Sequence, residues 1–209
     1  MSSSLPPRVL AWRTYGSSGV LAEFGSSEET LAAYRRCVAG DFDECVPGAQ
    51  TIYFESLRLA SSELVSLVKS LLDKPSLEVG GEIASEHSFK VCYDGADLES
   101  VSSMTGFSVE EVVHRHSSAV YTVAFLGFSR SFPYLAGLDP AIIVPRLATP
   151  RTSVPAGSVG MGAGYTGIYP MSSPGGWQLL GHTDAVLFDA TNDPPSILTT
   201  GDLVRFVRV

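Results

Sequence analysis

Residues 145–170 read PRLATPRTSVPAGSVGMGAGYTGIYP, a stretch in which prolines and glycines interrupt every apolar run after a few residues. The pattern extends to both sides, because 16 of the 54 residues in 129–182 are Gly or Pro, against 17 of the other 155. Gly and Pro adopt the backbone angles of tight turns, and short apolar runs between turns are typical of strands. The second half of the chain is therefore predicted to be an all-β barrel or sandwich.

The first half shows helix and strand patterns in alternation. Ser26 and Glu29 have the spacing of a capping box, after which Leu31, Tyr34 and Val38 would lie on one helix face. The clearest amphipathic helix begins at residue 61, where apolar residues recur with a helical period: Leu64, Leu67, Val68, Leu71 and Leu72. Strands are expected at residues 9–12, 20–24, 51–55, 76–79 and 89–93.

Two helices among several short strands predict an α+β domain with ferredoxin-like order. Gly80, Gly81 and the polar residues 82–88 have the composition of a connection between domains, although Pro75 is a competing boundary. We therefore expect a first domain at residues 1–85 and a β domain at residues 86–209. Beyond the strand at residues 89–93, the β domain is expected to hold a helix capped by Ser108 and then a buried strand at residues 120–128.

Composition and charge exclude several classes of function. The chain has 209 residues, 14 Lys and Arg against 22 Asp and Glu, and a mean hydropathy of +0.18. A formal charge of −8 and only three lysines do not suit a nucleic-acid partner. No stretch approaches the roughly 18 apolar residues of a membrane span, and the first twenty residues hold no apolar signal core. A cytoplasmic protein without a membrane partner is expected.

Known catalytic and metal-binding motifs are absent from the sequence. The three cysteines form no CxxC pair, so neither a disulfide framework nor a thiolate metal site is expected. The phosphate-binding loop, HExxH and G-x-S-x-G patterns are also missing. His114 and His116 would diverge on a helix, and the Gly-rich run at residues 157–167 suits tight turns about as well as an anion site.

Two arginines are the most informative charged residues of the second half. Arg146 and Arg151 each follow a proline, which holds them on stiff backbone in a segment with few other charges. Guanidinium groups match carboxylates and phosphates in shape and charge, so the pair would suit a small anionic substrate. The alternative is that each arginine bonds carbonyl groups of its own loop.

Several longer runs resemble one family closely: LGFSRSFPYLAGLD at residues 126–139, PRLATPR at 145–151, VPAGSV at 154–159, TGIYP at 166–170 and SPGGWQ at 173–178. The chain is identified as a member of the family that holds the B-type subunit of 5-oxoprolinase, allophanate hydrolase subunit 1 and the Kip-type histidine-kinase inhibitor. The resemblance implies a ferredoxin-like domain followed by a cyclophilin-like β-barrel of carboxyltransferase type. It also implies a larger carboxyltransferase-like sister subunit and, in the oxoprolinase branch, ATP as co-substrate.

Three motifs depart from the family pattern, at four residues in all. Arg130 and Ser131 replace a Pro-Gly pair, Tyr165 replaces a glutamine, and His182 replaces an arginine. A charge gained at Arg130 would compensate for the arginine lost at residue 182. Such an exchange would suit an anionic substrate of the allophanate type.

The favoured hypothesis is a subunit of a heteromeric hydrolase of C–N bonds, acting on an allophanate-like before an oxoproline-like substrate. Arg146 and Arg151 would bind the anionic group, with Arg151 stabilising the transition state. Proton transfer is assigned to His116 or His182. Substrate orientation is assigned to Arg130, Ser158, Tyr165 and Thr166. No metal is expected.

Two rival hypotheses remain open. The chain would instead regulate a histidine kinase, with Phe132, Tyr134 and Trp177 as anchors, although these aromatic residues fit a core better. It would otherwise supply only scaffold and interface to a catalytic partner.

Overall fold

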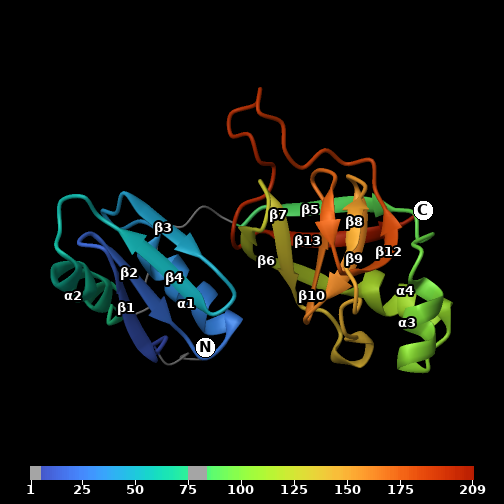
Figure 1. The fold of residues 1–209 in the computed structure, drawn as a ribbon, viewed down its shortest axis with the longest axis horizontal. Coiled ribbons are helices and arrows are strands. Elements are labelled where there is room, and N and C mark those ends of the chain that lie inside the picture. Colours follow the sequence, from blue (N-terminus) through green and yellow to red (C-terminus); the bar gives the residue numbers. More distant parts are fainter. Residues whose placement is uncertain (1–5, 75–83) are drawn as a thin grey trace. The chain divides into compact units, whose positions relative to one another are not determined.

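The computed structural model describes residues 6–74 and 84–209 (Figure 1). Contacts within the chain divide it into two compact units, with the division between Ala84 and Ser85. The strand expected at residues 76–79 lies outside the described residues. Each unit has its own buried apolar core.

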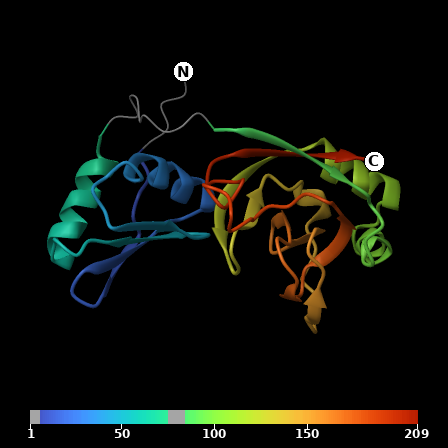
Figure 2. The same cartoon turned by 90° about the horizontal axis from the view of Figure 1, so that it is seen from above.

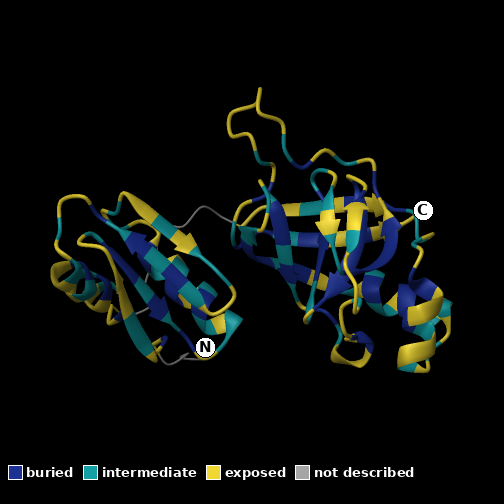
Figure 3. Ribbon diagram, viewed as in Figure 1, coloured by how far each residue is buried: buried dark blue, intermediate teal, exposed yellow. Residues whose placement is uncertain are grey.

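The first unit is a four-stranded antiparallel sheet with two helices. The strands lie in the order β1-β2-β4-β3, α1 packs on β3 and β4, and α2 packs on β1 and β2. Its elements are β1 (Ala11–Tyr15), β2 (Gly19–Glu23), α1 (Ser27–Cys37), β3 (Glu44–Pro47), β4 (Thr51–Glu55) and α2 (Ser61–Leu72). Every second residue of β4 is buried, as Figure 3 shows, so one face of the sheet carries the core.

The ferredoxin-like order of this unit stays a prediction. That order requires a strand after the second helix, and the residues that follow α2, 75–83, lie outside the described residues. The edge position beside β2 is held by β1, which forms a hairpin with β2. Within the described residues, the unit consists of a four-stranded sheet with two helices packed on it.

The second unit is built on a curled seven-stranded sheet with the order β12-β9-β10-β7-β6-β13-β5 (Figures 1 and 2). All neighbouring strands are antiparallel except β13 and β5. The strands of this sheet are β5 (Glu86–Val91), β6 (Val120–Gly127), β7 (Phe132–Ala136), β9 (Ser158–Gly162), β10 (Tyr165–Ile168), β12 (Gln178–His182) and β13 (Leu203–Arg208). The remaining elements are α3 (Leu98–Thr105), α4 (Val109–Ser118), the 3₁₀ turn η1 (Pro140–Ile142), β8 (Arg151–Val154) and β11 (Ser173–Gly175).

The two edges of the curled sheet meet at one place. Cys92, just beyond β5, donates its amide to the carbonyl of His182 at 2.9 Å, and His182 returns the bond to Cys92 at 2.9 Å. We call this junction the seam. Because each group at the seam has a partner, neither sheet edge presents a free backbone ladder at this point. The mixed sheet-and-helix class is confirmed, and the curled sheet is consistent with the expected cyclophilin-like barrel.

One helix in each unit begins at a serine whose hydroxyl caps it. The Ser108 hydroxyl accepts the amide of Glu111 at 3.2 Å, and the Ser26 hydroxyl of the first unit accepts that of Glu29 at 3.1 Å. Both predicted N-caps are therefore confirmed. Among the described residues, no helix is long and apolar enough to cross a membrane.

Candidate functional site

Arg146 lies at a small hollow in the second unit that is otherwise lined by aromatic residues and glycines. The hollow has a volume of about 60 Å³ and is lined by Phe128, Phe132, Tyr134, Arg146, Tyr169, Gly175, Gly176 and Trp177. We call it the Arg146 hollow. Its lining residues come from β7 and the turn before it, from the loop before β8, and from β11 and the segments that flank it, so distant parts of the sequence meet here.

The aromatic rings of the hollow hold one another in place. Trp177 meets Phe132 edge-on with ring centroids 5.1 Å apart and Tyr134 at 5.5 Å. Phe132 also meets Tyr169 edge-on at 4.9 Å. Edge-to-face pairs at these separations are favourable and fix ring orientation. Phe132 and Trp177 are nearly fully buried, as is Tyr169, and Tyr134 is partly buried against them. The expectation that Phe132 and Trp177 belong to the core is therefore confirmed.

Glycines allow this close packing. A Cβ added at Gly162 would lie 2.7 Å from the Trp177 ring and 3.1 Å from Cγ of Arg146, and one added at Gly175 would overlap the Tyr169 hydroxyl. Side chains at these positions would therefore displace the rings of the hollow. Gly162, a member of the Gly-rich run, therefore lets the Trp177 ring and the Arg146 side chain lie directly against the backbone of β9.

The Arg146 guanidinium is the charged group of the hollow. Its central carbon lies 6.0 Å from the Trp177 ring centroid, and the side chain is exposed. No ion pair of Arg146 occurs in residues 6–74 and 84–209. Burial raises the pKa of Tyr134 and of Tyr169, so both hydroxyl groups stay neutral near pH 7. The hollow thus offers one cation beside aromatic faces, which suits a carboxylate.

Arg151 is engaged elsewhere, although the sequence grouped it with Arg146. Its guanidinium donates to the Asp97 carboxylate at 2.7 Å, and the other oxygen of Asp97 accepts the amide of Leu179 at 2.6 Å. The Asp97 side chain is only 9% exposed. Breaking a pair this deeply placed would leave a buried charge without its partner. The geometry therefore gives Arg151 a role in joining β8 to β12 and the start of α3.

His116 and Thr166 come together in the core of the second unit. His116 is fully buried, its Nδ1 lies 2.7 Å from the Tyr93 hydroxyl, and its Nε2 lies 2.8 Å from Oγ1 of Thr166. Thr166 in turn donates to the carbonyl of Gly160 at 3.0 Å. Since the Thr166 proton goes to that carbonyl, Nε2 of His116 carries the proton and Nδ1 accepts from Tyr93. Burial lowers the pKa of His116 to about 3, so the ring is neutral.

The other predicted site residues are spread over the unit. Tyr165 meets Tyr134, a lining residue of the Arg146 hollow, edge-on at 5.7 Å, but does not itself line the hollow. Arg130 is exposed in the β6–β7 turn, 5.9 Å from the ring of Phe188, and Ser158 is buried at the start of β9. His182 is exposed at the seam with Nδ1 2.9 Å from Asp94. Of the predicted site residues, the structure therefore brings His116 and Thr166 into direct contact, and it places Tyr165 against a lining residue of the Arg146 hollow.

The sequence did not reveal Asp97, the partner of Arg151. The two residues are 54 positions apart, and no spacing rule connects them.

The departure from the family pattern at Ser131 lies in the β6–β7 turn. Ser131 has a φ of 60°, in the left-handed region that favours glycine. The glycine of the family pattern at this position is thus explained by the turn.

The family description "Carboxyltransferase domain, subdomain C and D" matches residues 10–198. The chain belongs to this family. The match spans most of the described residues of both units, so the family resemblance of the sequence runs is confirmed.

Known relatives of this carboxyltransferase-domain chain carry a common name, that of the B-type subunit of 5-oxoprolinase. The chain is 38% identical over 183 residues to the protein of this name from Bacillus subtilis, a match that covers 80% of this chain and 76% of the relative. It is 52% identical over 120 residues to the one from Escherichia coli O157:H7, a match that covers 56% of this chain and 55% of that relative. The solved structure of TTHA0988 superposes with a TM-score of 0.76 at 35% identity, and the match covers 91% of this chain but 40% of that protein.

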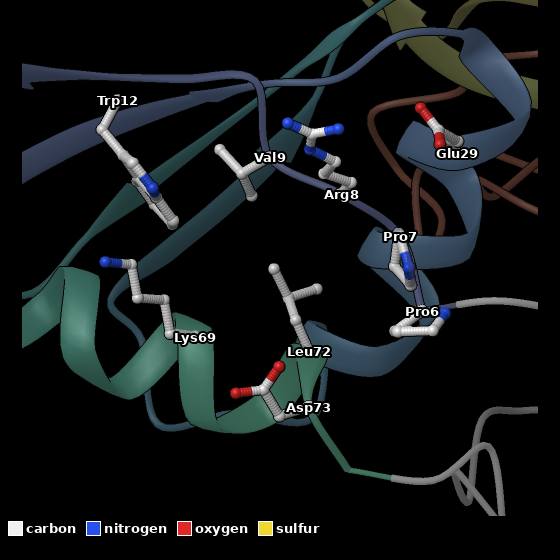
Figure 4. A pocket seen from close by; sticks show the side chains of 9 residues that line it. All are labelled: Pro6, Pro7, Arg8, Val9, Trp12, Glu29, Lys69, Leu72 and Asp73. Carbon is white, nitrogen blue, oxygen red and sulfur yellow. The ribbon is translucent and has the colours of Figure 1, made fainter.

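A second, larger hollow lies in the first unit (Figure 4). It has a volume of about 550 Å³ and is lined by Pro6, Pro7, Arg8, Val9, Trp12, Glu29, Lys69, Leu72 and Asp73. The Lys69 ammonium lies 6.0 Å from the Trp12 ring centroid, and Figure 4 shows it pointing toward that ring. None of the site residues predicted from the sequence lines this hollow.

Proposed function

We propose that this chain is the B-type subunit of a heteromeric amidohydrolase of the 5-oxoprolinase class. The shared name of the relatives at 38% and 52% identity supports this assignment. In this proposal a larger carboxyltransferase-like subunit is the partner, and ATP is the co-substrate that drives opening of the lactam ring. The names of the relatives favour 5-oxoproline over allophanate, the substrate type that the sequence placed first.

The observation that carries the proposal is the position of the Arg146 guanidinium beside the Trp177 ring in a hollow lined by aromatic side chains. Among the described residues, no carboxylate forms an ion pair with it. 5-Oxoproline has one carboxylate on a small, flat ring, which matches one cation beside ring faces. The hollow, at about 60 Å³, is several-fold smaller than the roughly 300–1,000 Å³ of a complete ligand site. It accommodates the carboxylate end of such a substrate, and a partner subunit would enclose the rest.

The residues of the hollow would bind and orient the substrate. Arg146 would hold the carboxylate, and Trp177 would exclude water from one side of the ion pair, which strengthens it. The neutral hydroxyl of Tyr169 would offer a hydrogen bond at a fixed position. None of the side chains lining the described hollow is a carboxylate, histidine or cysteine, so the proposal assigns proton transfer and bond cleavage to the partner subunit.

The two histidines predicted for proton transfer have no place in this proposal. His116 is buried with both ring nitrogens bonded and a pKa near 3, so it neither reaches substrate nor holds a proton at neutral pH. His182 lies at the seam and does not line the Arg146 hollow.

Substitution of Arg146 in the reconstituted complex tests the proposal. The chain is co-expressed with the larger subunit and the remaining oxoprolinase components, and is offered 5-oxoproline and allophanate separately, with and without ATP. Arg146→Gln should lower kcat/KM for 5-oxoproline about a hundredfold, the effect of losing about 3 kcal/mol from a hydrogen bond to a charged group.

Arg13→Gln is the matched control, since Arg13 is an exposed arginine of the first unit paired with Glu23. This control should keep full activity. Unchanged kcat/KM in an assembled Arg146→Gln complex would contradict the binding role. Turnover of allophanate but not 5-oxoproline would contradict the substrate.

A further inference from the structure

Three side chains of metal-ligating type meet at the seam of the curled sheet. The ligand atoms of Cys92, Asp94 and His182 all lie within 4.8 Å of one another. Nδ1 of His182 and Oδ1 of Asp94 are 2.9 Å apart. None of the three residues lines the Arg146 hollow, so the cluster is independent of the proposed substrate site.

Backbone geometry brings the three side chains to one face. Cys92 and His182 exchange both backbone hydrogen bonds at 2.9 Å, and residues paired in this way in antiparallel strands project side chains to the same side. Asp94 follows Cys92 by two residues, the spacing at which extended backbone returns to the same face. The seam therefore presents sulfur, oxygen and nitrogen donors together.

Glycines make the seam tight and stiff. A Cβ added at Gly181 would overlap the carbonyl oxygen of Cys92, and one added at Gly95 would overlap the backbone of Leu179 and Leu180. Residues 92–95 are thus pressed against β12 with backbone in contact with backbone. Donor groups on such a support are held in place before any ligand arrives, which lowers the entropy lost on binding.

We propose that Cys92, Asp94 and His182 form a three-ligand site for a divalent transition metal, with Zn²⁺ the best match. Thiolate, imidazole and carboxylate are the donors that Zn²⁺ accepts in tetrahedral sites, and sites with three protein ligands keep a fourth position open. Binding releases the Cys92 thiol proton to solvent. The metal takes the Nδ1 position of His182, and the neutral ring carries its one proton on Nε2.

Space for the fourth ligand lies beside the cluster. Cys92 and His182 both line a hollow of about 420 Å³, whose other lining residues include Lys90, Thr183 and Asp184. A water molecule or a small anion would enter from this hollow, and Lys90 would favour an anion.

The other cysteines do not compete for the metal. Cys37 belongs to the apolar core of the first unit and Cys45 packs against it, and among the described residues neither belongs to a group of three or more metal-ligating side chains. A spectroscopic signal from a metal-bound thiolate in this protein would therefore come from Cys92.

Cobalt titration tests the site, because a Co²⁺–thiolate bond gives charge-transfer absorption that oxygen and nitrogen ligands do not give. The full chain, freed of metal with a chelator, should bind one Co²⁺ with this absorption, and Zn²⁺ should abolish it by displacement. Cys92→Ser should remove the absorption. Asp94→Asn alters an exposed side chain and so preserves the fold, and it should weaken Co²⁺ binding at least about tenfold.

Cys45→Ser and His114→Gln are matched controls for the thiol and the imidazole, and both should bind Co²⁺ like the unaltered chain. Absence of the thiolate absorption in the unaltered chain would overturn the proposal. So would absorption that persists in Cys92→Ser, or equal Co²⁺ affinity in Asp94→Asn and the unaltered chain. The readout uses no enzymatic activity, so it is unaffected by the outcome for the Arg146 hollow.

Discussion

At the scale of single residues, His116 shows how a polar side chain is accommodated in an apolar core. Its ring stacks on Phe206 with centroids 4.9 Å apart, while its nitrogens join Tyr93 to Thr166. Every hydrogen-bonding group of the ring has a partner, so the burial leaves no unsatisfied donor. The arrangement suits only the neutral ring. A second ring proton would sit on Nδ1 and point at the hydroxyl proton that Tyr93 now donates to that nitrogen.

Stability should therefore fall in acid through His116. The unfolded state takes up the histidine proton near pH 6.5 and the folded state near pH 3, so the unfolded state binds more protons between these values. The free energy of unfolding then rises with pH across this window and is level above it. From pH 7 to pH 5 this residue should cost about 2 kcal/mol, measured by urea unfolding as the difference from His116→Gln.

His114→Gln is the control, because His114 is exposed two residues earlier on the same helix. This variant should keep the acid sensitivity of the unaltered chain. An equal loss in His116→Gln would show that other groups cause it.

The candidate site was predictable only where local sequence determines it. Prolines marked the loops of Arg146 and Arg151, but only the fold reveals that Asp97 neutralises Arg151 and that no described carboxylate does so for Arg146. The Cys92, Asp94 and His182 cluster was equally invisible, since His182 is 88 positions from Asp94. Contacts across a sheet depend on strand order, which residue spacing does not encode.

At the scale of elements, caps and long amphipathic patterns were predicted well. Helix α2 begins at the expected Ser61, and α1 begins at the Ser26 cap. The predicted face of α1 was only partly right: Tyr34 packs against the core, but the fully buried residues are Thr30, Ala33 and Cys37, and Val38 is 41% exposed. Small residues let the helix approach the sheet closely, and a pattern based on large apolar residues overlooks them.

One strand was placed two residues too early, and two short elements were missed. The strand expected at 9–12 begins at Ala11 in β1, and β3 and helix α3 were not anticipated. Helix α3 is short and its buried residues, Leu98 and Val101, are too few to show a helical period. The ladder in which β1 pairs with β2, rather than an apolar run, determines where this strand begins.

Closure of the seam should depend on Gly181. A side chain here collides with the backbone of Cys92, which cannot move without breaking the two hydrogen bonds of the seam. Gly181→Ala should lower the free energy of unfolding by about 3 kcal/mol, the upper range for overpacking a rigid site. Urea unfolding followed by circular dichroism measures the change.

Gly127→Ala serves as its comparison, since an added Cβ there would meet its nearest neighbour at an ordinary 3.6 Å. Its cost should stay below about 1 kcal/mol. Equal stability of the two variants would show that the seam tolerates displacement.

At the scale of the whole molecule, each unit has the components of an independent fold. The first has a core between its sheet and two helices, and the second has a large core and an aromatic cluster around Trp177. The two tryptophans of the chain are divided between them, Trp12 in the first unit and Trp177 in the second. Fluorescence can therefore follow one unit at a time.

The second unit should unfold cooperatively on its own. In Trp12→Phe, Trp177 is the sole tryptophan and reports the second unit within the full chain. A fragment of residues 84–209 should show the same urea midpoint, because its core is complete without the first unit. A lower midpoint for the fragment would show that the first unit stabilises the second.

The place of β13 in the sheet has a consequence for how the chain folds. This strand lies between β5 and β6, with Arg205 paired to Ser88 on one side and to Val120 on the other. A nascent chain therefore carries β5 and β6 out of the ribosome long before the strand that separates them is made. Contacts so distant in sequence form slowly, and until then two strand edges are open to other chains. Strand order therefore predicts an aggregation-prone stage between the synthesis of β6 and that of β13.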